Sequence, residues 1–129
     1  MAEEERTRSI IGAFFAVYNT LGFGFLETVY LAALERELRE RGHDVAREVS
    51  IRVLYKGEEI AWHRVDMIVD GLVIVEVKST MNLAPIAGRQ LYNYLRATRL
   101  EVGLLLHFGP EPELFRHYSA NAQRQTPNA

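Results

Sequence analysis

Apolar positions recur along the chain with two different periods, which divide it into seven predicted elements. Helical spacing from about residue 4 to 20 ends where glycine interrupts LGFG, and a second apolar stripe runs from about Leu26 to Arg41. Strand-like segments, a further helix and a continuous apolar strand follow. These later elements are EVSIRVLY (48–55), EIAWHRVDMIV (59–69), LVIVEVK (72–78), a helix at 85–98 and EVGLLLHF (101–108).

The order α, α, β, β, β, α, β predicts an α/β fold with a mixed sheet flanked by helices. The crossover through the third helix makes the last strand parallel to one of its neighbours. A chain of 129 residues suits one domain, which we place at 1–118, followed by a polar tail at 119–129.

Besides Asp70 in its turn, the apolar hairpin VDMIVDGLVIVEVK, residues 65–78, contains three charged residues, Asp66, Glu76 and Lys78. Strand alternation puts Glu76 and Lys78 on one face. The face of Asp66 depends on the turn. A two-residue turn, Asp70-Gly71, pairs position 66 with 75 and separates the charges, whereas a three-residue loop at 69–71 pairs 66 with 74 and unites them. Glycine in third place favours the three-residue loop, although the two-residue turn is common and the sequence alone leaves it open.

Other polar side chains are expected near the same face. Glu27 lies at the edge of the second helix's apolar stripe, and Gln90 and Tyr94 are four residues apart on the third helix. Burying several carboxylates against one lysine is unfavourable unless protons or a cation neutralise them. Because the chain has no cysteine and no clustered histidines, the hard oxygen ligands favour Mg²⁺ or Mn²⁺ over zinc.

Each of these features also has an ordinary structural explanation. A Glu-x-Lys pair on an edge strand is usually a solvated salt bridge, and an acid near a helix start is favoured by the helix dipole. The four histidines have no metal-ligand spacing, so we assign them no role. Five arginines fit an ordinary solvated surface better than a specific phosphate-binding surface. They nevertheless form the best local basic patch for nucleic acid: Arg36, Arg39, Arg41, Arg47 and Arg52.

Charge and hydropathy narrow the functional classes. Fifteen basic and seventeen acidic residues give a formal net charge of −2, so the overall charge of the chain does not indicate nucleic-acid binding. The charged start MAEEERTR and the short apolar stretches predict neither a signal peptide nor a membrane span. Together with the absence of cysteine, this composition predicts a cytoplasmic protein.

The ordered blocks resemble the PD-(D/E)XK nuclease superfamily, whose pattern is a helical glutamate, a strand aspartate, E-x-K on the next strand and Q-x-x-x-Y on a helix. More narrowly, GFLETVY (24–30) matches the signature of the GxxExxY family, and the likeness extends over about residues 8–118. Val65 stands where a proline often precedes the superfamily aspartate. The resemblance implies a restriction-endonuclease-like core and these roles: metal binding by Asp66, Glu76, the Val77 carbonyl and Glu27, directly or through water; catalysis by Lys78 with Asp66, Glu76 and Gln90; and support from Tyr94 and Tyr30.

Two functions of different classes are consistent with the sequence. The first is a Mg²⁺- or Mn²⁺-dependent nuclease that hydrolyses phosphodiester bonds, with DNA favoured over RNA because most of the superfamily acts on DNA. The second is a catalytically idle nuclease-like fold that binds nucleic acid or protein, or forms homo-oligomers. The acidic set with its lysine favours the first, and the near-neutral charge favours the second.

Overall fold

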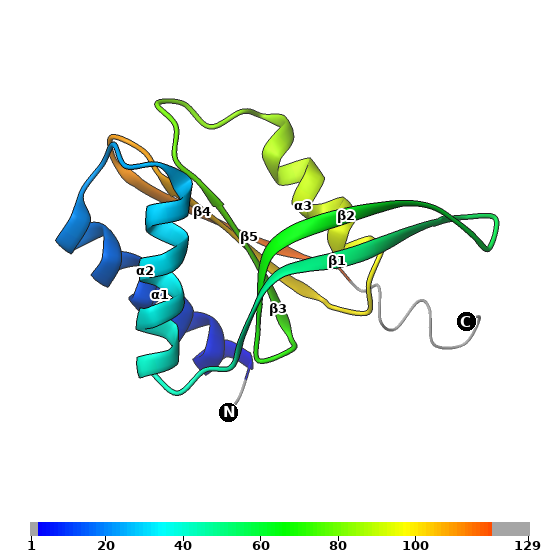
Figure 1. Cartoon of the computed structure of the whole chain (residues 1–129), viewed down its shortest axis with the longest axis horizontal. Coiled ribbons are helices and arrows are strands. Elements are labelled where there is room, and N and C mark those ends of the chain that lie inside the picture. The colour runs from blue at the N-terminus through cyan, green and yellow to red at the C-terminus, as the bar shows by residue number, and fades with distance from the viewer. Residues whose placement is uncertain (1–2, 120–129) are drawn as a thin grey trace.

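The computed structural model describes residues 3–119 and contains three helices and five strands (Figure 1). Among these residues, no helix is long and apolar enough to cross a membrane. The predicted tail at 119–129 lies outside the described residues except for Ser119. In chain order the elements are α1 (Glu3–Leu21), α2 (Glu27–Glu40), β1 (Val45–Tyr55), β2 (Glu58–Val69), β3 (Val73–Lys78), α3 (Ile86–Arg96), β4 (Val102–Phe108) and β5 (Pro112–Tyr118).

All five strands form one mixed sheet in the order β1-β2-β3-β4-β5. Only β3 and β4, which the α3 crossover connects, are parallel among the described pairs, as predicted. Strand alternation divides the core into two. Val75 and Leu104 face α1 and α2, whereas Ile74 and Leu105 pack with Leu91 of α3 on the other side. The predicted α/β architecture with helices on both faces of the sheet is therefore confirmed.

Strand β5 was not predicted. Its residues, PELFRHY, alternate weakly because the strand lies at the edge of the sheet and is mostly exposed, so the hydrophobic signal of a buried strand is missing. Pro112 at its first position is typical of an edge strand, where one missing backbone donor is tolerated. The predicted element order therefore lacked its last member.

The turn between β2 and β3 combines the two predicted alternatives. Asp70 and Gly71 both have positive φ, 56° and 66°, and the Leu72 amide donates to the Val69 carbonyl at 3.0 Å, as in a two-residue turn. However, Val69 pairs with Val73, so Leu72 is an extra, bulged residue. The predicted loop at 69–71 and its pairing of 66 with 74 are wrong, but the bulge preserves the face predicted for Asp66.

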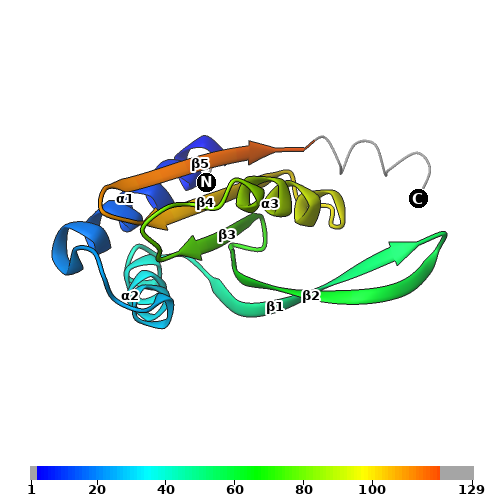
Figure 2. The same cartoon turned by 90° about the horizontal axis from the view of Figure 1, so that it is seen from above.

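The β1–β2 hairpin is bent and projects beyond the rest of the molecule (Figures 1 and 2). Glu48 of β1 has a positive φ of 53° and lies between the pairs Arg47–Met67 and Val49–Val65. Across this irregularity the faces exchange, because Met67 packs in the α1–α2 core while Val65 packs in the α3 core. The bend leaves a hollow between β2, β3 and α3.

Candidate active site

The hollow is a cavity of about 210 Å³ on the α3 side of the sheet. It contains five of the residues expected from the sequence, and it brings together residues that are up to 42 positions apart, from His63 to Leu105. The lining residues are His63, Arg64 and Asp66 of β2, Glu76 and Lys78 of β3, Ala87, Gln90 and Tyr94 of α3, and Leu105 of β4.

Two carboxylates connect the strands where regular pairing stops. The last β2–β3 pair at this end is Met67–Val75. Beyond it, the Asp66 amide donates to Glu76 Oε2 at 3.1 Å, and the Val77 amide donates to Asp66 Oδ2 at 2.8 Å. The side chains therefore replace backbone carbonyls as acceptors for two buried amides. This arrangement holds both carboxyl groups at the cavity wall.

Glu76 is 8% exposed and lies beside a second carboxylate. Burial raises the pKa of Glu76 to about 8, and the hydrogen bond and negative charge of Asp66 act in the same direction, against the positive charge of Lys78. At neutral pH the pair thus holds a proton that an isolated glutamic acid would have released.

The α3 side of the cavity supplies an amide and a phenol. Gln90 and Tyr94 both line it, as their spacing of four predicted. Burial raises the pKa of the Tyr94 phenol, and the charges of Glu76 and Asp66 raise it further, so the phenol keeps its proton and can donate it in a hydrogen bond.

His63 is a cavity residue to which the sequence assigned no role. Its ring stacks on that of Tyr94, with centroids 4.0 Å apart and planes 15° from parallel. Burial and the positive charge of Lys78 lower the pKa of His63, although Asp66 opposes them. Strand alternation alone would place positions 63 and 66 on opposite faces, and only the bend in β2 brings both to one cavity. No local sequence signal could have indicated this.

Glu27 lies outside the cavity. Its carboxylate accepts the Ser79 amide at 3.2 Å and lines a separate hollow with Phe25, Ser79 and Met81. Among residues 3–119, no three His, Cys, Asp or Glu side chains are grouped closely enough to hold a metal ion. Glu27 therefore anchors the backbone directly after Lys78, and the structure does not bring it to the Asp66–Glu76 pair.

Tyr30 has a structural position as well. Its hydroxyl donates to the Gly22 carbonyl at 2.5 Å and accepts the Phe25 amide at 3.3 Å, and its ring stacks on Phe108. Gly24 between these loop residues has a φ of 112°, a conformation that favours glycine. The G-x-x-E-x-x-Y block thus shapes the α1–α2 connection and ties it to the end of β3.

Most of the expected basic patch is neutralised. On α2 and at its C-cap, three arginines form i,i+4 ion pairs with glutamates, and Arg47 of β1 binds Glu35 at 2.8 Å. The helical pairs are Arg36–Glu40, Arg39–Glu35 and Arg41–Glu37, at 3.0 to 3.1 Å. Within residues 3–119, the structure records no ion pair for the fifth member, Arg52, which is exposed on the projecting hairpin.

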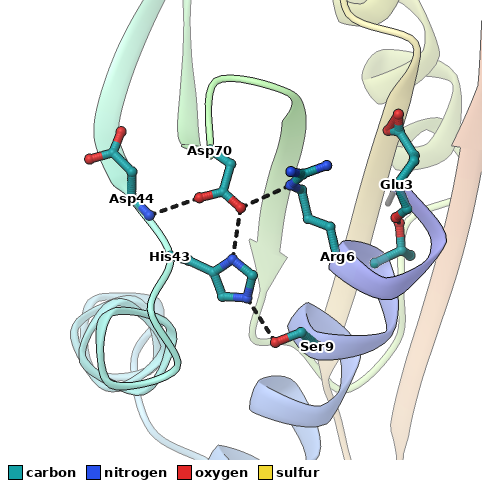
Figure 3. A network of polar contacts seen from close by, with 7 residues as sticks. Glu3, Arg6, Ser9, His43, Asp44 and Asp70 are labelled. Atoms are coloured by element: carbon teal, nitrogen blue, oxygen red, sulfur yellow. Dashed lines mark hydrogen bonds and ion pairs between the residues drawn. The ribbon is translucent and has the colours of Figure 1, made fainter. Parts of the chain in front are cut away.

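A second buried polar cluster lies at the other end of β2 and includes a serine, a histidine and an aspartate (Figure 3). Ser9 Oγ is 2.7 Å from His43 Nε2, and His43 Nδ1 is 2.8 Å from Asp70 Oδ2. Asp70 also accepts from Arg6 Nε at 2.9 Å and from the Asp44 amide at 2.8 Å. Ser9 lies within α1, where backbone amides bond along the helix and form no oxyanion hole. The cluster therefore connects α1, the α2–β1 loop and the β2–β3 turn.

The fold and the cavity together define a nuclease-like α/β domain. A family model described as the PD-(D/E)XK nuclease superfamily matches residues 4–117. The chain therefore belongs to the PD-(D/E)XK nuclease superfamily, whose members typically use divalent metal ions and act on nucleic acid. No curated protein and no solved structure gives a significant match to the chain. Membership of the narrower GxxExxY family stays a prediction.

Proposed function

We propose that this protein is a metal-dependent nuclease that hydrolyses phosphodiester bonds of nucleic acid, with DNA as the favoured substrate. The observation that carries the proposal is the meeting of Asp66, Glu76 and Lys78 at one cavity beside the bend in β2. A carboxylate pair with an adjacent ammonium is suited to holding a cation and to stabilising charge on a phosphate. The superfamily to which the chain belongs supports this chemistry.

The donor set fits a hard divalent cation. Asp66 and Glu76 would hold it, with the Val77 carbonyl as a third oxygen ligand, as the superfamily pattern implies. Since no third acidic side chain joins the pair among the described residues, water would complete the coordination, which suits Mg²⁺ or Mn²⁺. When bound, the cation would polarise a phosphate oxygen and promote attack by water. The proton on the carboxyl pair would leave as the cation enters.

The other cavity residues act on the substrate and on the pair itself. Lys78 would donate to the phosphate oxygens as negative charge grows on them in the transition state. Gln90 would orient the attacking water or the phosphate through its amide, and the protonated Tyr94 phenol would donate a hydrogen bond from α3. Glu27, through its bond to the Ser79 amide, would position the end of β3 and thus Lys78.

The decisive experiment is a single-turnover cleavage assay at saturating protein with Mn²⁺, on single-stranded, duplex and branched DNA and on RNA. We expect Lys78→Ala to reduce the cleavage rate by two to three orders of magnitude, which corresponds to about 3 to 4 kcal/mol of transition-state stabilisation. Lys56→Ala, which changes the other lysine of the chain, is the matched control and should cleave at the wild-type rate.

Metal binding is measured separately through the melting temperature. Mn²⁺ should raise it for wild type and Lys78→Ala, because a ligand that binds only the folded state stabilises that state, but not for Glu76→Gln. Equal residual cleavage in all variants would indicate a contaminating nuclease. Absence of cleavage on every substrate would instead favour the idle fold that acts as a binding or oligomerisation module.

A further inference from the structure

The projecting part of the β1–β2 hairpin carries an exposed tryptophan beside the candidate active site. Trp62 is 61% exposed and is the only tryptophan of the chain. Tryptophan is usually well buried in folded proteins, so an exposed ring on a strand is informative. The hairpin projects beyond the rest of the molecule (Figures 1 and 2), and Trp62 lines a hollow of about 320 Å³ together with Arg52 and with Ala97 and Thr98 after α3.

Two arginines flank Trp62 on the same face of the hairpin. Arg52 is its direct cross-strand partner, and Arg64 follows it by two residues along β2. Arg64 lies 3.9 Å from Glu48, but both side chains are well exposed, so this ion pair is weak. Arg64 also lines the candidate active-site cavity. This face is opposite to that of His63 and Val65, and it meets the cavity at Arg64, beyond the last β2–β3 pair, where the edge of β2 is unpaired.

We propose that this face, comprising Arg52, Trp62 and Arg64, binds single-stranded nucleic acid and leads it past Arg64, around the unpaired edge of β2, to the cavity. One base stacks on the Trp62 ring, while Arg52 and Arg64 contact the flanking phosphates. The proposal rests on the proposed nuclease function for the direction of the strand. Asp66 is four residues from Trp62, at most about 14 Å along an extended strand, so the strand needs few nucleotides to span the distance.

Two features favour a single strand as the occupant. The face of the tryptophan ring can stack only on a base whose own face is free, and bases inside a duplex are stacked on each other. The positive side chains complement a phosphate backbone, while the uncharged apolar residues Leu54, Tyr55 and Ile60 lie nearer the hairpin tip. A second copy of the chain docked through that apolar tip is the competing occupant.

Because Trp62 is unique, the fluorescence of the unmodified protein reports directly on this site. The experiment titrates a 12-nucleotide single strand, and separately a duplex of the same sequence, into the full chain in EDTA. We expect quenching by the single strand that weakens steeply with salt, and little quenching by the duplex. The chelator prevents metal-dependent cleavage, so this binding result does not depend on whether the protein is an active nuclease.

Variants are compared by the anisotropy of a labelled single strand. Trp62→Ala should weaken binding about tenfold or more, and Trp62→Phe should retain most of it. Arg52→Ala and Arg64→Ala should each reduce the slope of log affinity against log salt by about 1. The matched controls are Arg116→Ala and Tyr118→Ala, an exposed Arg-x-aromatic pair on β5 at the opposite edge of the sheet, and they should bind like wild type.

Several outcomes would overturn the proposal. Equal quenching by duplex and single strand would show that the ring is not used for stacking. Loss of binding in the β5 controls to the same extent would show a nonspecific surface. If Trp62 fluorescence instead changes with protein concentration alone, and sedimentation shows a dimer that Trp62→Ala abolishes, the face is an interface between copies. Binding as expected with no cleavage in Mn²⁺ would retain the proposal and reject the nuclease function.

Discussion

Two carboxylate clusters lie at opposite ends of the same stretch of β2, and they differ in how their charge is satisfied. Asp70 accepts three hydrogen bonds, from Arg6, His43 and the Asp44 amide. Although burial opposes ionisation, these bonds hold the pKa of Asp70 below its usual value. At the cavity, Asp66 and Glu76 face each other with one backbone amide each, and the pKa of Glu76 rises to about 8.

This difference separates a structural carboxylate from a candidate functional one. Asp70 is ionised and saturated with donors, so it connects three segments and has no capacity for a further ligand. The Asp66–Glu76 pair has two acidic groups and too few positive partners, a condition that a proton relieves in the free protein and that a cation relieves better. Residue type alone does not distinguish the two clusters, because Ser9, His43 and Asp70 also have the composition of a hydrolase triad.

The largest expected effect is on the pH dependence of stability. Glu76 has a raised pKa in the folded state, so in chelator its contribution to the free energy of unfolding falls as pH rises from about 5 to 8, by about 1.4 kcal/mol per pH unit. Glu76→Gln cannot ionise and should be more stable than wild type at pH 8. Urea unfolding of both proteins at several pH values measures the growing difference between them. A constant difference would mean that Glu76 is already ionised in the folded protein.

The second expected effect is the loss of the Asp70 cluster. Asp70→Ala leaves Arg6 and His43 without their shared acceptor and should reduce the free energy of unfolding by about 3 kcal/mol at pH 7. Because the pKa of Asp70 is lowered, its contribution is present above pH 4 and is lost as pH falls through the folded value. Thermal unfolding measures it, and Asp44→Ala, an exposed neighbour, is the control. If the cleavage rate per folded molecule of Asp70→Ala also falls below that of wild type, Asp70 has a functional role as well.

The smallest expected effect concerns Ser9. Ser9→Ala removes one hydrogen bond to His43 and should cost about 1 kcal/mol of stability, with no change in nuclease rate per folded molecule. Denaturant unfolding together with the cleavage assay tests both statements. Loss of an ester- or phosphodiester-cleaving activity in this variant would contradict the structural role of the serine, histidine and aspartate.

Most of the correct predictions about the fold came from the periodicity of apolar residues within single helices and strands. Alternation along β3 put Glu76 and Lys78 on one face, and the spacing of four put Gln90 and Tyr94 together on α3. These relations depend only on the geometry of a single helix or strand. Strand β5 escaped prediction because an exposed edge strand has little hydrophobic alternation.

By itself the sequence determined every helix and strand except β5 and, within each regular stretch, which side chains share a face, because the backbone fixes the periods of 3.6 and 2. Only the tertiary structure decided the relations between elements. The bulge at Leu72 set the β2–β3 register, the bend at Asp66 brought His63 into the cavity, and ion pairs with glutamates neutralised four of the five arginines. It also kept Glu27 at the Ser79 amide. These distances depend on pairings between segments far apart in the chain, which no local pattern encodes.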